Sequence, residues 1–128
     1  MATKLPSNLK YTAEHEWVDF KDGVAFIGIT DFAQSSLGDV VYVEIPDTGK
    51  KISKDQPFGV VESIKSVSDL FAPISGEIIE KNSAVESSPE LINEDCYHNW
   101  LIKIKPTNSS EMESLLTPEA YKKQIDGK

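Results

Sequence analysis

Glycine and proline recur at short intervals along this 128-residue chain, and they limit the length of any regular element more than any other feature does. The chain contains seven residues of each type. Between them lie short runs rich in β-branched and aromatic residues, which are typical of strands. The clearest runs are the segments 24–29, 40–45, 58–64, 76–79 and 100–104. Short strands separated by frequent turns predict a mainly β fold, either a sandwich or a barrel.

Helix signals are brief and lie outside these runs. Asp31 is placed to cap a short helix over 32–37, and Gly38 would end it. Ser88 before Pro89 predicts a second brief helical turn, with proline at the first helical position.

The C-terminal stretch carries the strongest helix signals. Ser110 followed by Glu113 matches a capping box, and Thr117 before Pro118 supplies a second helix start. We therefore predict one domain over residues 1–128, with C-terminal helices at about 109–126.

The charge balance excludes some classes of partner. The chain has 13 basic and 21 acidic residues, a net charge of −8, and every basic residue is lysine. Nucleic-acid binding requires clustered positive charge and usually arginine, so no nucleic-acid partner is expected. No apolar run approaches the roughly 20 residues of a membrane span, so no membrane partner is expected either.

The compartment is inferred from what the chain lacks. Cys96 is the single cysteine, so it cannot form an internal disulfide, and the N-terminal residues do not resemble a signal peptide. These features predict a cytoplasmic protein, or a mitochondrial matrix protein if the chain is a processed form.

Lys65 is the most suggestive single residue. The segment 58–70 has the pattern strand, polar tip, strand, with Lys65 at the tip among small serines. An exposed lysine there is accessible to another protein's active site, and acylation would turn it into a long, uncharged arm. The same position also fits an unmodified lysine that only solvates the turn.

Ordered motifs over nearly the whole chain are similar to one known family. The matching segments are 15–17 (His-Glu-Trp), 28–34, 37–46, 59–65, 68–70, 72–76, 91–93 and 100–106. In these segments the sequence resembles the H proteins of the glycine cleavage system, which carry a lipoyl group.

The resemblance implies a fold and a role. The fold would be a lipoyl/biotinyl-type barrel-sandwich hybrid with short peripheral and C-terminal helices. Lipoic acid would be attached covalently to Lys65, within the matching segment. The protein would be a non-catalytic carrier of an aminomethyl group. Its implied partners are glycine decarboxylase, an aminomethyltransferase, dihydrolipoyl dehydrogenase and a lipoate-attaching enzyme.

The family holds its loaded arm in a surface cleft, because the cationic aminomethyl group would release formaldehyde if water attacked it. By motif position, the acidic partners of that amine would be Glu16 and Asp69, and Glu14 could add negative charge. The alternative for all three residues is a solvated acidic face.

Other interpretations stay open at this point. Cys96 and His98 could form a nucleophile and base, but no third group is positioned by the sequence, and a small enzyme is not expected. A plain interaction module would leave Lys65 unmodified. Biotin is the competing cofactor, but its usual Met-Lys-Met tip is absent. An H-like protein that relays lipoyl groups to other complexes is the alternative within the family.

Overall fold

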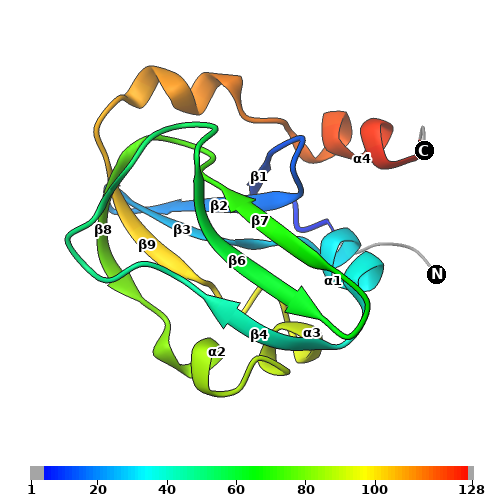
Figure 1. Ribbon diagram of the computed structural model, residues 1–128. Coiled ribbons are helices and arrows are strands. Elements are labelled where there is room, and N and C mark those ends of the chain that lie inside the picture. Colours follow the sequence, from blue (N-terminus) through cyan, green and yellow to red (C-terminus); the bar gives the residue numbers. More distant parts are fainter. Residues whose placement is uncertain (1–4, 127–128) are drawn as a thin grey trace.

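The computed structural model describes residues 5–126 and contains two antiparallel β-sheets (Figure 1). The first sheet has the order β1-β2-β3-β9-β8-β5, and the second has the order β4-β6-β7. The strands are β1 (Lys10–Tyr11), β2 (Glu16–Lys21), β3 (Val24–Ile29), β4 (Val40–Glu44), β5 (Lys51–Ile52), β6 (Pro57–Ser63), β7 (Val67–Phe71), β8 (Gly76–Lys81) and β9 (Ile102–Pro106). The mainly β prediction is confirmed.

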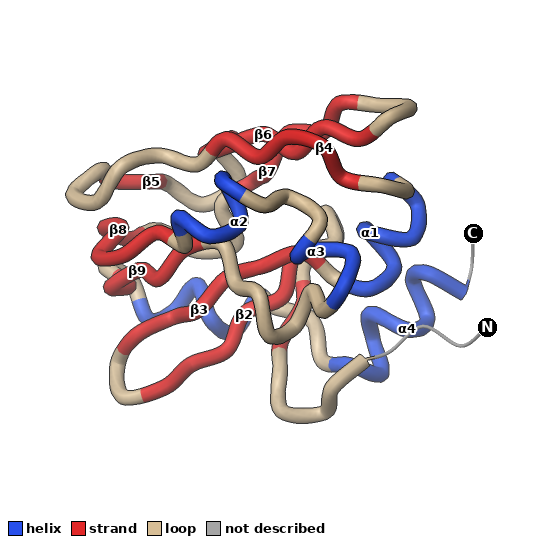
Figure 2. Tube along the Cα trace, turned by 90° about the horizontal axis from the view of Figure 1, so that it is seen from below, coloured by secondary structure: helices blue, strands red, loops and turns tan. Residues whose placement is uncertain are grey.

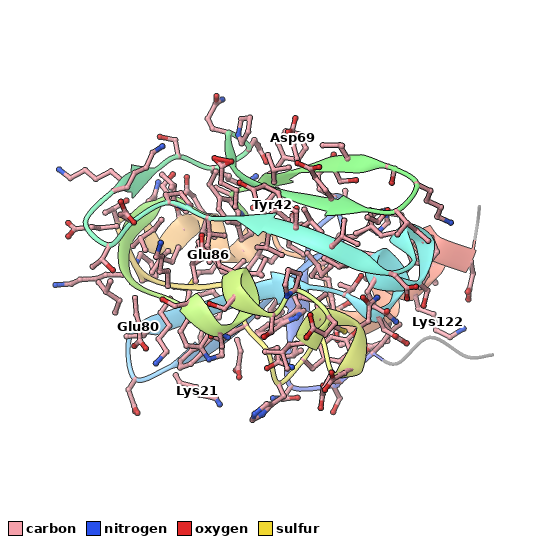
Figure 3. All side chains as sticks on the ribbon, turned by 60° about the horizontal axis from the view of Figure 1, so that its bottom comes forward. Lys21, Tyr42, Asp69, Glu80, Glu86 and Lys122 are labelled. Atoms are coloured by element: carbon pink, nitrogen blue, oxygen red, sulfur yellow. The ribbon has the colours of Figure 1, made fainter. Side chains whose placement is uncertain are left out.

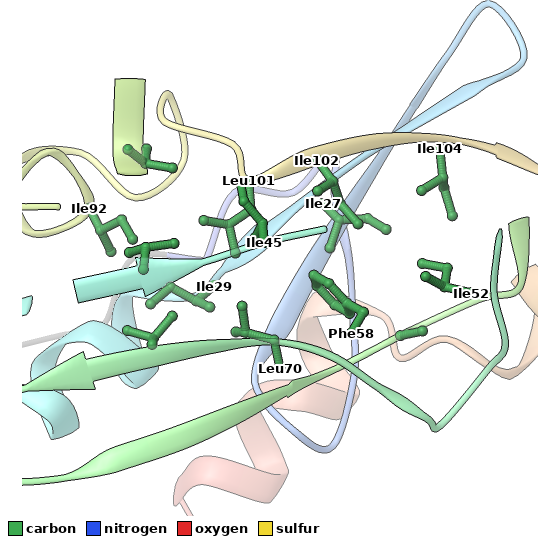
Figure 4. Close-up of a cluster of buried hydrophobic side chains, with 14 of the residues drawn as sticks. Ile27, Ile29, Ile45, Ile52, Phe58, Leu70, Ile92, Leu101, Ile102 and Ile104 are labelled. Atoms are coloured by element: carbon green, nitrogen blue, oxygen red, sulfur yellow. The ribbon is translucent and has the colours of Figure 1, made fainter. Parts of the chain in front are cut away.

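The two sheets form layers that pack face to face. Figure 2 shows β4, β6 and β7 on one side and β2, β3, β8 and β9 on the other. Buried side chains of both sheets meet in the core between them, as in Ile27 and Ile104 of the first sheet and Val61 and Leu70 of the second. Figure 4 shows buried hydrophobic side chains, among them Ile27, Leu70 and Ile104, between the ribbons of the two sheets. Full burial of each such residue contributes about 1.5 to 3 kcal/mol.

Short helices lie around the two sheets. They are α1 (Asp31–Leu37), α2 (Ser83–Ser87), α3 (Leu91–Glu94), a 3₁₀ helix (Ser109–Ser114) and α4 (Pro118–Asp126). Within the described part of the chain, none of the helices has the length and hydrophobicity needed to cross a membrane.

A second hydrophobic cluster holds α4 against the first sheet. The rings of Tyr11 in β1 and Tyr121 in α4 stack with centroids 4.9 Å apart and planes 6° apart. Leu9, Trp17 and Ile125 are buried with them. This cluster places the C-terminal helix beside the start of β2.

The cap of α1 differs from the sequence prediction. Asp31 was predicted to cap the helix, but the hydroxyl of Thr30 accepts the hydrogen bond from the backbone N–H of Ala33 at 3.2 Å. Asp31 lies inside the first turn, where it accepts from the side chain of Gln34. The predicted end at Gly38 is confirmed, and its φ of 81° suits glycine.

The other helix starts agree only partly with their signals. Thr117 caps α4 as predicted, accepting from the N–H of Ala120 at 3.1 Å. Ser110 is not a cap, because Asn108 caps the 3₁₀ helix. The turn predicted at Ser88 leads into α3, which begins three residues later, and α2 was not predicted.

Candidate functional site

Lys65 lies at the exposed tip of the β6–β7 hairpin. The two strands pair from Pro57 with Phe71 to Glu62 with Val67. Ser63 closes the turn, since its hydroxyl oxygen accepts from the backbone N–H groups of Lys65 at 3.3 Å and Ser66 at 3.1 Å. This local network presents the lysine in a tight turn, as the sequence pattern predicted.

The hairpin tip also contacts the connection between α1 and β4. The backbone N–H of Ile64 donates to the carbonyl oxygen of Asp39 at 3.2 Å. A Cβ atom on Gly38 would lie 3.7 Å from Cε of Lys65, so the lysine stem runs beside the end of α1.

A cleft of about 240 Å³ opens next to this stem. Its walls come from the hairpin, from α1 and from the start of β2. Its lining residues are Glu14, His15, Glu16, Ile29, Phe32, Ala33, Ser36, Leu37, Val61, Ser66, Ser68, Asp69 and Leu70. The structure thus brings together Glu16 and Asp69, which are 53 positions apart in the sequence, and adds Glu14 to the same cleft.

Glu16 is a buried carboxyl group, with only 2% of its surface exposed. Its Oε1 lies 2.6 Å from the hydroxyl of Thr12, and its Oε2 accepts from the backbone N–H of Phe71 at 3.2 Å. Burial raises the pKa of this carboxyl to about 8, while the two hydrogen bonds oppose the rise. Glu16 is therefore mostly protonated at pH 7, although a nearby ammonium group would favour its carboxylate form.

Asp69 has the opposite environment. It lies on β7 paired with Val60, and it is exposed at the surface of the sheet (Figure 3). The prediction from motif position gave Glu16 and Asp69 the same role, as carboxylate partners of the amine. In the structure one is buried and accepts hydrogen bonds, and the other is exposed to water.

His15 connects the cleft to the C-terminal helix. Its backbone has a φ of 71°, and its Nδ1 lies 2.8 Å from the hydroxyl of Tyr121. That hydroxyl is also 2.8 Å from the hydroxyl of Thr30, the cap of α1. The ring of His15 packs at 4.8 Å from the ring of Phe32. The sequence did not predict these contacts of His15 and Thr30 with Tyr121, because no local pattern links residues so far apart.

The other candidate residues are placed apart from the cleft. Cys96 is buried in the main core, and its backbone carbonyl accepts from the indole N–H of Trp17 at 3.0 Å. His98 is exposed and donates its backbone N–H to Asp95. Among residues 5–126 there is no group of three or more His, Cys, Asp or Glu side chains arranged to hold a metal ion.

The fold matches a solved structure over most of its length. A crystal structure of a glycine cleavage system H protein from Mycobacterium marinum superposes with a TM-score of 0.87 at 40% identity, covering 94% of this chain and 98% of that one. The fold is that of a lipoyl-domain barrel-sandwich hybrid, as the resemblance implied.

Sequence comparisons give the same result. The model of the glycine cleavage H-protein family matches residues 9–128. A glycine cleavage system H protein from Bacteroides thetaiotaomicron is 50% identical over 123 residues, which cover 95% of this chain and 98% of the relative. One from Carboxydothermus hydrogenoformans is also 50% identical, covering 95% of each chain. The chain belongs to the glycine cleavage H-protein family.

Proposed function

We propose that this protein is the lipoyl-carrying shuttle of the glycine cleavage system, with lipoic acid attached to Lys65. Membership of the family supports the carrier role. The observation that supports the residue is the position of Lys65, exposed at the tip of a tight hairpin and beside a cleft. The bound lipoyl group would supply a disulfide that accepts and releases the aminomethyl group.

The surroundings of Lys65 suit an arm that moves between water and the cleft. Its stem runs beside Gly38, and the preceding residues Ser36 and Leu37 line the cleft. Amide formation at Nζ removes the lysine charge, so the modified side chain can lie against the apolar lining. Leu70 and Val61 provide that lining from the hairpin.

Glu16 and Asp69 would then hold the cationic end of the loaded arm. A charge-assisted hydrogen bond of this kind contributes about 1.5 to 3 kcal/mol, and less where water competes. A carboxylate at this point keeps a primary amine protonated, and a protonated amine lacks the lone pair that its breakdown requires. Buried Glu16 is the stronger of the two partners, because water screens exposed Asp69.

The wider assignment follows the family. The partners would be glycine decarboxylase, the aminomethyltransferase, dihydrolipoyl dehydrogenase and a lipoate-attaching enzyme, and the carrier itself would catalyse no step. A relay of lipoyl groups to other complexes is not favoured, since the relatives are named for glycine cleavage. A single domain and a cytoplasmic location stay predictions.

Attachment can be tested by incubating the protein with lipoate, ATP and a lipoate ligase. Intact mass should rise by one lipoyl group, and a peptide map should assign it to Lys65. Lys51, an exposed lysine on β5, supplies the matched control. Lys51→Arg should be modified like the wild type and Lys65→Arg should not. An adduct that persists in Lys65→Arg would refute the assignment.

A further inference from the structure

The segment 91–93 is one of the matching motifs, yet the proposed chemistry gives it no part. In the structure, Asn93 lies in α3 and engages both ends of its amide group. Its Nδ2 donates to the carbonyl of Gly38 at 2.9 Å and to Oε1 of Gln34 at 3.0 Å. Its Oδ1 accepts from the backbone N–H of Val40 at 2.8 Å. A side-chain amide is suited to this task because it donates and accepts at once.

These bonds hold the backbone on both sides of Asp39. The carbonyl oxygen of Asp39 in turn accepts from the N–H of Ile64, the residue before Lys65. A short path of hydrogen bonds therefore runs from Asn93 to the hairpin tip.

Burial of apolar side chains contributes little to fixing the tip of the β6–β7 hairpin against the rest of the protein. Ile64 is 72% exposed and Val67 is 65% exposed. Few apolar contacts are therefore available to fix the tip against the body, and the bond to Asp39 takes on more of this task. A small shift of the α1–β4 connection would be passed to the lysine.

We propose that Asn93 is a positioning residue that clamps Asp39 and so fixes the orientation in which the hairpin presents Lys65 to the lipoate-attaching enzyme. This proposal rests on the proposed function, because it takes Lys65 as the attachment site. Asn93 does not line the cleft beside Lys65, and it acts through the backbone on either side of Asp39.

Two variants at this position separate the clamp from general stability. Asn93→Ala removes all three hydrogen bonds. Asn93→Asp keeps the acceptor for Val40 but places a carboxylate against the oxygens of Gly38 and Gln34. Asn99 provides a matched control. Its Nδ2 also donates to two backbone carbonyls, of Leu91 and Asp95, but it makes no bond to the α1–β4 connection.

Two measurements test the proposal. The first is hydrogen exchange of the Ile64 amide, which needs no lipoate. Under conditions where all variants stay folded, the Ile64 amide hydrogen should exchange faster in both Asn93 variants. In Asn99→Ala it should exchange at the wild-type rate. The second is lipoylation kinetics, in which kcat/KM should fall by about tenfold in the Asn93 variants, mainly through KM. Asn99→Ala should keep the wild-type values.

Three results would overturn the proposal. If the Ile64 amide exchanges at the wild-type rate in Asn93→Ala, Asn93 does not hold the hairpin tip. Faster exchange with unchanged lipoylation would show that the clamp has no part in presenting Lys65. Equal losses in Asn99→Ala would show a general effect of stability. Failure of the wild type to accept lipoate at Lys65 would instead refute the proposed function, and Ile64 exchange would still test the clamp by itself.

Discussion

The buried carboxyl of Glu16 makes the stability of this protein depend on pH in an unusual direction. Its pKa is about 8 in the folded chain, against an ordinary value of 4.5. Between these values the folded state holds a proton that the unfolded state has lost. The stabilisation is thus complete below about pH 4.5 and is lost as pH rises through 8.

The size of the effect follows from this difference. Each pH unit in the window changes the free energy of unfolding by about 1.4 kcal/mol. The slope is smaller close to each pKa, so between pH 5 and pH 8 the wild type should lose about 3 to 4 kcal/mol from this group. Glu16→Gln should not, because an amide does not titrate. The amide also has nearly the size and shape of the carboxyl group, and its oxygen can still accept from the backbone N–H of Phe71.

Urea unfolding at a series of pH values is the appropriate assay, followed by the fluorescence of Trp17 and Trp100. Glu16→Gln and the wild type should differ little at pH 5. The variant should be about 3 to 4 kcal/mol more stable at pH 8. Glu14→Gln is the matched control for loss of a carboxylate at the exposed rim of the same cleft.

The reasoning would be refuted by a difference between Glu16→Gln and the wild type that is the same at pH 5 and pH 8. An equal change of slope in Glu14→Gln would refute it as well, because burial would then not be the cause.

Three further outcomes are expected. Glu16→Gln combined with Asp69→Asn should speed formaldehyde release from the loaded arm by about tenfold, through loss of charge-assisted bonds, and an unchanged rate would remove both residues from the amine site. Gly28→Ala should cost about 1 to 3 kcal/mol in urea unfolding, because the added Cβ would lie 2.6 Å from the ring of Trp17. Cys96→Ser should shuttle at the wild-type rate, since Cys96 binds Trp17 through its backbone carbonyl, and an inactive variant would contradict this.

Local sequence patterns predicted the strands well where the pattern is self-contained. The segment 24–29 forms β3 with the predicted limits, and the other four predicted strands shift by one or two residues at their ends. The sequence analysis placed the cap of α1 on Asp31, and this prediction is wrong by one residue. Thr30 takes the cap, and its hydroxyl also meets Tyr121 from α4, a contact between residues 91 positions apart.

In the candidate site, too, local residues decide some features and distant residues decide others. The tip position of Lys65 was predictable because neighbouring residues decide it: two β-forming runs flank a polar turn that Ser63 closes. Motif resemblance proposed Glu16 and Asp69 as partners of one group, and both residues line the same cleft. It did not indicate that one carboxyl is buried and the other exposed.

The sequence by itself determined the short strands, the turns and the exposed lysine, because these depend on residues close together in the chain. Tertiary structure alone decided the protonation of Glu16 and the hydrogen-bond partners of Asn93. The first depends on the burial of the Glu16 side chain between packed elements, and the second on the approach of α3 to the α1–β4 connection. Both need segments far apart in sequence to meet, which only the packed sandwich brings about.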